Sequence, residues 1–196
     1  MSPEEAVVRR LRAEIEHELG RLARLRRDAA GAPRSDDPYA IRARGSILHD
    51  LYNGMERIFG RIADELDGGP PRGDTRHQQL VRSMTLRIDG VRPRVITPEL
   101  QTELRDFLGF RHLFRNIYGD ELDVERLVRL EERLPEALND FESQIRAFLD
   151  WMTGPLEGVT SDPLGSRRAL PISPGTLQIV TLETVISMDS APIRDR

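Results

Sequence analysis

Side chains that could bind a ligand or take part in catalysis are concentrated at residues 111–118, which read Arg-His-Leu-Phe-Arg-Asn-Ile-Tyr. They combine two guanidinium groups, an imidazole, an amide and a phenol within about two helical turns. On a helix, Arg111 and Tyr118 point in nearly the same direction, and His112 and Asn116 form an adjacent pair. A single ligand the size of a phosphate group can therefore contact all five polar side chains.

The residues upstream indicate that these polar side chains interrupt a buried helix face. Apolar residues at steps of three and four mark that face at Leu100, Leu104, Phe107 and Leu108. The same steps lead next to Arg111, Arg115 and Tyr118. Positively charged side chains on a helix face that is otherwise apolar and buried predict a functional site.

The segment resembles the Arg-x4-His-x-Tyr motif of HEPN-domain toxins, in particular the HepT-like ribonucleases. Arg111 and Tyr118 match the motif, and Asn116 stands where the family has histidine. Further similarity is carried by residues 44–52, by residues 55–59, and by residues 121–122 with the helix that follows them. The resemblance covers roughly residues 1 to 152, and the helical layout expected from the sequence strengthens it beyond the short motif.

The resemblance implies the toxin of a toxin–antitoxin system, an endoribonuclease that cleaves RNA without a metal ion or cofactor at a composite site in a homodimer. In that site Arg111 holds the scissile phosphate and offsets the charge of the transition state. Arg115 is either a second phosphate contact or a solvated surface charge. Tyr118 either stacks on a base or is the tyrosine that the antitoxin modifies with AMP. The expected partners are RNA, a second copy and a cognate antitoxin, in some HepT-like systems a minimal nucleotidyltransferase.

The asparagine at position 116 leaves two interpretations open. A neutral amide cannot exchange protons near pH 7, so Asn116 can position a substrate but cannot act as the family histidine does. His112, one turn away, is the titrating side chain that can take over this role, with His49 and Asp50 as supporting residues from an earlier helix. In the alternative interpretation catalysis is lost, and the chain is a HEPN bundle that binds RNA or protein.

Composition narrows the class of protein. The 196 residues suffice for one domain, and no apolar stretch approaches the roughly 18 residues of a membrane span. The N-terminus does not resemble a secretory signal and cysteine is absent, so we expect a cytoplasmic protein. The formal charge of −4 argues against a broadly basic nucleic-acid binder, so an RNA contact must be a local patch. The four histidines lack metal-ligand spacing, and no metal site is expected.

Hydrophobic periodicity predicts an all-α fold, an antiparallel up-and-down bundle of four to five helices that is HEPN-like. The expected helices run from Pro3 to about Asp28, Pro38 to about Asp67, residue 74 or 75 to about Ile88, Thr97 through the motif, and Asp123 to about Trp151. Residues 1–152 should form the bundle. Residues 153–196, with scattered prolines and glycines, should form an irregular and flexible tail.

Overall fold

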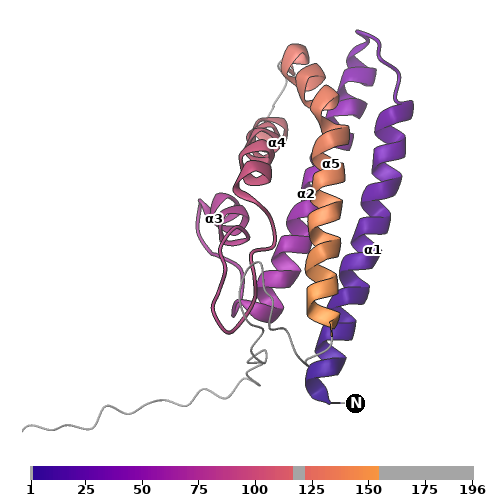
Figure 1. Cartoon of the computed structure of the whole chain (residues 1–196). Helices are drawn as coiled ribbons and strands as arrows, with labels where there is room; N and C mark the ends of the chain where they lie inside the picture. The colour runs from indigo at the N-terminus through magenta and orange to yellow at the C-terminus, as the bar shows by residue number, and fades with distance from the viewer. Residues whose placement is uncertain (1, 117–121, 155–196) are drawn as a thin grey trace, which may run out of the picture.

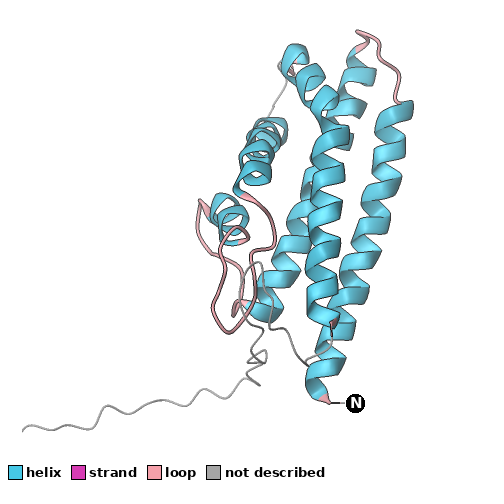
Figure 2. Ribbon diagram, viewed as in Figure 1, coloured by secondary structure: helices cyan, strands magenta, loops and turns pink. Residues whose placement is uncertain are grey.

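The computed structural model describes residues 2–116 and 122–154, and these ranges contain five α-helices. Their bounds are α1 Pro3–Gly31, α2 Pro38–Leu66, α3 Arg76–Ser83, α4 Pro98–Asn116 and α5 Val124–Thr153. The predicted all-α class is confirmed, because the described residues form no strand beyond an isolated bridge between Ile88 and Arg92 (Figure 2). The predicted tail lies outside the described residues from position 155 onward, and the domain boundary stays a prediction.

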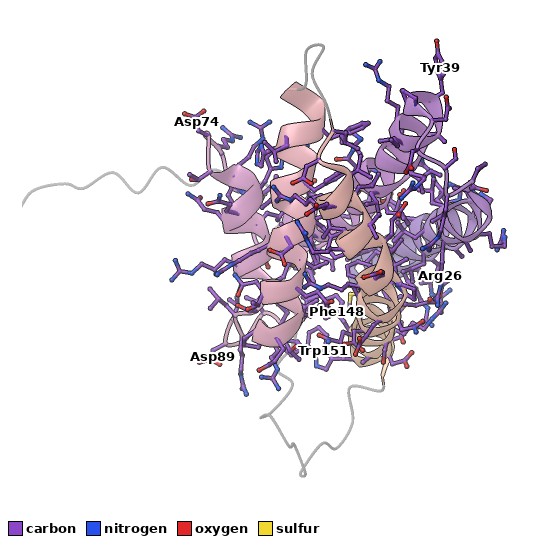
Figure 3. All side chains as sticks on the ribbon, turned by 90° about the horizontal axis from the view of Figure 1, so that it is seen from above. Arg26, Tyr39, Asp74, Asp89, Phe148 and Trp151 are labelled. Carbon is purple, nitrogen blue, oxygen red and sulfur yellow. The ribbon has the colours of Figure 1, made fainter. Side chains whose placement is uncertain are left out.

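Three long helices, α1, α2 and α5, form the body of the bundle, and α1 runs antiparallel to the other two (Figure 1). The shorter α3 and α4 cover α2 on the side away from α1, and they run across the long helices when the molecule is seen from above (Figure 3). Helix α2 contacts all four other helices. Residues on its different faces therefore reach both the central core and the helix that carries the motif.

Capping side chains fix where the two site-bearing helices begin. Asp37 accepts a hydrogen bond from the backbone N–H of Ala40 at 3.0 Å, at the start of α2. Thr97 does the same for Leu100 at 3.3 Å, at the start of α4. Each such cap stabilises a helix by about 1 kcal/mol. These caps help to set the register in which α2 and α4 present their side chains to each other.

The predicted apolar stripes form one core. Helix α4 contributes the buried side chains Leu100, Leu104, Phe107, Leu108 and Phe110. The line that leads to Arg111 is therefore buried, as its spacing predicted. Within the described part of the chain, no helix is long and apolar enough to cross a membrane.

Helix α3 ends at Ser83, earlier than the expected end near Ile88. The chain turns there and returns with Arg92, a residue that is 2% exposed. The Arg92 guanidinium forms two 2.6 Å hydrogen bonds with the Asp67 carboxylate and also donates to the backbone carbonyls of Ser83 and Leu86. Carbonyls at a helix end need such partners. The last helical turn expected from the periodicity, up to Ile88, is therefore absent. Hydrogen bonds from the buried Arg92 satisfy the carbonyls at this end of α3 instead.

Candidate functional site

Arg111 lies on the face of α4 that packs against α2, and its side chain is held by that helix. Its Nε donates to Asn53 Oδ1 at 2.6 Å, and its Nη2 lies 3.5 Å from Glu56 Oε2. The residue is only 8% exposed, so the guanidinium group is largely withdrawn from water. No further hydrogen-bond partner of Arg111 lies among the described residues, and donors therefore remain for an anionic ligand.

Glu56 also binds His77, which brings α3 into the site. The hydrogen bond joins His77 Nδ1 to Glu56 Oε1. With the Glu56 carboxylate as acceptor, Nδ1 is the donor in this bond, and Nε2 is the ring nitrogen that lies outside it. The His77 ring packs edge-on against His112 of α4, with ring centroids 5.9 Å apart. One carboxylate therefore orients both Arg111 and an imidazole, and a second imidazole lies beside the first.

A neutral phenol completes the buried part of this cluster. Tyr52 is 1% exposed, and its hydroxyl has no hydrogen-bond partner in the described structure. Burial raises the pKa of Tyr52 far above its ordinary value, the nearby Glu56 carboxylate raises it further, and the Arg111 charge lowers it. The hydroxyl is therefore protonated at neutral pH, and it is a donor without an acceptor.

The two predicted supporting residues differ in position. His49 faces the motif helix, since its ring centroid lies 5.5 Å from that of Phe114. It is also 3.1 Å from the amide nitrogen of Asn53, the residue that holds Arg111. Asp50 contacts His49 at 3.3 Å, but more than half of its side chain is exposed. The structure thus connects His49 to the Arg111 cluster and leaves Asp50 at its edge.

Three predicted residues cannot be located as side chains. Arg115 and Asn116 are the last two positions of α4, and their side chains lie outside the described residues, as does the whole of Tyr118. The helix does continue through Asn116, so the backbone places this residue one turn beyond His112. The roles of these three residues stay predictions.

Sequence reasoning missed Asn53, Glu56 and His77. A signal for the first two existed, because polar residues at 49, 53 and 56 follow helical steps within an otherwise apolar line of α2. His77 gave no such signal, since it lies on an eight-residue helix whose placement depends on the fold around it. Within residues 2–116 and 122–154, no three His, Asp or Glu side chains are grouped so that they could hold a metal ion.

Comparison with known proteins defines the family. Residues 43–152, more than half of the chain, match the family described as HepT-like protein, and the chain therefore belongs to the HepT-like family. The matched region contains every site residue described above. In structure the chain is similar to the cytosolic protein of unknown function YutE from Bacillus subtilis, with a TM-score of 0.59 and 21% sequence identity over 74% of this chain and 94% of that chain. That similarity shows the shared fold. No curated protein matches the sequence.

Proposed function

We propose that this HepT-like chain is a metal-independent endoribonuclease and the toxin of a toxin–antitoxin pair. The observation that supports the proposal is the arrangement around Glu56, which fixes the buried Arg111 and orients His77 beside His112. An arginine held in this way is a preorganised donor for a phosphodiester. Imidazole is the side chain suited to proton transfer near neutral pH.

The proposed reaction is attack by a ribose 2′-hydroxyl on the adjacent phosphorus. A bond forms between the 2′-oxygen and phosphorus, and the bond from phosphorus to the 5′-oxygen breaks, which leaves a 2′,3′-cyclic phosphate and a 5′-hydroxyl. We assign acceptance of the 2′-hydroxyl proton to the exposed His112. Donation to the leaving 5′-oxygen is assigned to His77 in its doubly protonated form, which gives up the proton on Nε2 and keeps the proton on Nδ1 in the bond to Glu56. Arg111 stabilises the charge that develops on the phosphoryl oxygens.

The proposal includes two protein partners. One α4 supplies few groups with which to surround a phosphodiester, so the site is completed by a second copy whose α4 approaches the first. A cognate antitoxin, a nucleotidyltransferase that attaches AMP to Tyr118, would restrain the toxin. Arg115 and Tyr118 contact the RNA in this arrangement, and Asn116 positions it.

The experiment is RNA cleavage by the purified protein in EDTA. We expect wild-type protein to leave 2′,3′-cyclic phosphate ends. Arg111→Ala and His112→Ala should each lower the rate by about a hundredfold or more, because one removes the phosphate anchor and the other a proton carrier. Asn116→Ala should cost much less. Arg24→Ala, a change at an exposed position on α1, is the control and should cleave like wild type.

Asn116 also favours a second candidate function, an inactive HEPN bundle that binds RNA without cutting it. Under this alternative the wild type is inert in the same assay, binds RNA through Arg111, and gains cleavage when Asn116→His restores the motif. If wild type and Asn116→His are both inert and Arg111→Ala leaves RNA binding unchanged, both functions are excluded.

A further inference from the structure

A groove between α3 and α4 differs in charge from the rest of the surface. It has a volume of about 600 Å³ and reaches His112 of the candidate site. Its polar lining includes Gln78, Gln79, Arg82, Gln101 and Arg105. No aspartate or glutamate lines it, although the chain has 33 acidic residues against 29 basic ones. The groove is therefore a positive local patch on an acidic protein.

The helical repeat explains how two short polar stripes line this groove. On α3, Gln78, Gln79 and Arg82 lie at steps of three and four, and on α4 the same steps join Gln101, Arg105 and His112 through Gly109. Such stripes lie on one face of each helix. Because α3 and α4 pack side by side (Figure 3), the two polar faces border one channel.

The arginines of the groove are not neutralised. Arg82 and Arg105 are exposed, and neither has an ion-pair partner among the residues that the structure describes. The groove between α1 and α2 is the opposite case: Glu18 pairs there with Arg57 at 2.7 Å, and Arg61 lies 3.4 Å from Glu14. An arginine without a carboxylate partner retains its full capacity for a phosphate group.

A third arginine reaches the same wall from α5. Gly109 lines the groove, and a Cβ atom at this position would lie 2.7 Å from Nη2 of Arg126. The absence of a side chain at 109 thus lets the Arg126 guanidinium lie across α4. Arg126 also lacks a side-chain partner in the described ranges. The groove lining therefore holds two unpaired guanidinium groups, and a third, from α5, lies against Gly109 of its wall.

We propose that this groove binds single-stranded RNA and guides it to Arg111 and His112, an inference that rests on the proposed ribonuclease function. Arg82, Arg105 and Arg126 contact successive phosphates. The glutamine amides, which both donate and accept hydrogen bonds, contact base edges. Those edges are accessible in a single strand and are occupied by pairing in a duplex, so the groove selects unpaired RNA.

The test is binding of a labelled single-stranded 2′-O-methyl oligoribonucleotide of roughly 12 nucleotides, a length within the usual range for such grooves, to the full chain. The 2′-O-methyl group blocks cleavage, so binding is measured separately from catalysis. The double variant Arg82→Ala/Arg105→Ala is compared with Arg24→Ala/Arg27→Ala, which removes the same charge from exposed positions on α1. Helix α1 contacts neither α3 nor α4.

We expect the groove variant to bind about tenfold or more weakly than wild type. The slope of log Kd against log salt should fall by about 1.4 for two lost phosphate contacts. The α1 variant should stay within about twofold of wild type, and a duplex of the same sequence should bind more weakly than the single strand. Three results would overturn the proposal that the groove binds single-stranded RNA: an equal loss of affinity in both variants, no loss of affinity in the groove variant, or tighter binding of the duplex.

The outcomes also separate this inference from the proposed function. If RNA binding depends on Arg82 and Arg105 but unmodified RNA is not cleaved, the result supports RNA binding in the groove and contradicts the proposed ribonuclease function. If wild type and the groove variant cleave unmodified RNA with the same kcat/KM, the result supports the proposed ribonuclease function and overturns the proposal that the groove binds the RNA. Melting temperatures of both double variants show whether a loss reflects unfolding, and the single variants Arg82→Ala and Arg105→Ala then replace a double variant that fails to fold.

Discussion

Glu56 is the residue on which the other site residues converge. Its two carboxylate oxygens lie against Arg111 and His77, and its charge acts on Tyr52. A carboxylate that fixes a guanidinium and an imidazole at once removes rotamer freedom from both before a substrate arrives. The same charge partly offsets that of Arg111. The site is therefore preorganised by a group that lowers its attraction for an anion.

Tyr52 yields a prediction about stability. Tyr52→Phe should raise the free energy of unfolding by about 1 kcal/mol at neutral pH, because it removes a buried hydroxyl that has no partner. Urea unfolding measures this change. The control is Tyr39→Phe, at a residue that is 83% exposed, which should leave stability unchanged.

The pH dependence of the same variant has a definite sign. Burial raises the pKa of Tyr52 in the folded state, so the folded state holds the phenol proton more tightly than the unfolded state. This tighter proton binding contributes to the stability of the folded state. The contribution is complete below the ordinary pKa of 10.0 and is lost as the pH rises above that value toward the raised pKa of the folded state. Tyr52→Phe should remove this alkaline loss. A variant that is less stable than wild type at neutral pH would show that the hydroxyl makes a favourable contact.

At the scale of elements, the contact between α2 and α4 depends on a glycine. A Cβ atom at Gly45 would lie 2.7 Å from Cε2 of Phe114 and 3.2 Å from Cδ2 of Leu122. The Phe114 ring also stacks on Phe110 and packs against His49. The smallest side chain at 45 thus allows α4 to approach α2 closely enough to form the site.

Gly45→Ala should therefore lower the free energy of unfolding by about 1 to 3 kcal/mol, since the aromatic ring must move and overpacking outweighs the gain in helix propensity. The matched control is Gly60→Ala in the same helix, where a Cβ atom meets nothing within 4 Å. That change should stabilise the protein by up to about 1 kcal/mol. Thermal unfolding of both variants measures the difference, and a stabilised Gly45→Ala would contradict the close approach.

Sequence patterns predicted the helices where local signals suffice. The proline and cap residues gave the starts of α2 and α4, and the apolar steps up to Leu108 identified the buried face that continues to Arg111. They could not predict the end of α3, which depends on Arg92 returning from beyond it. They also could not pair Glu56 with His77, because that contact depends on how α3 crosses α2.

At the scale of the whole molecule, the proposed homodimer gives a further prediction. Leu113, next to His112 on α4, is 50% exposed, and such a side chain suits a face that a second copy covers. Leu113→Asp should shift the protein toward monomer in sedimentation experiments and abolish cleavage while the fold is retained. Leu86→Asp is the control, because Leu86 is 53% exposed but lies beyond the end of α3. A wild-type monomer at micromolar concentration would exclude the dimer.

The acid-free groove also has a consequence for how fast a polyanion finds this protein. With a formal charge of −4, the molecule as a whole repels RNA at long range, and the unpaired arginines of the groove attract it at short range. Encounters of RNA with most of the surface should therefore be shorter than encounters at the proposed groove. Charge distribution selects the orientation of approach before any base is contacted, and added salt weakens both the repulsion and the selection.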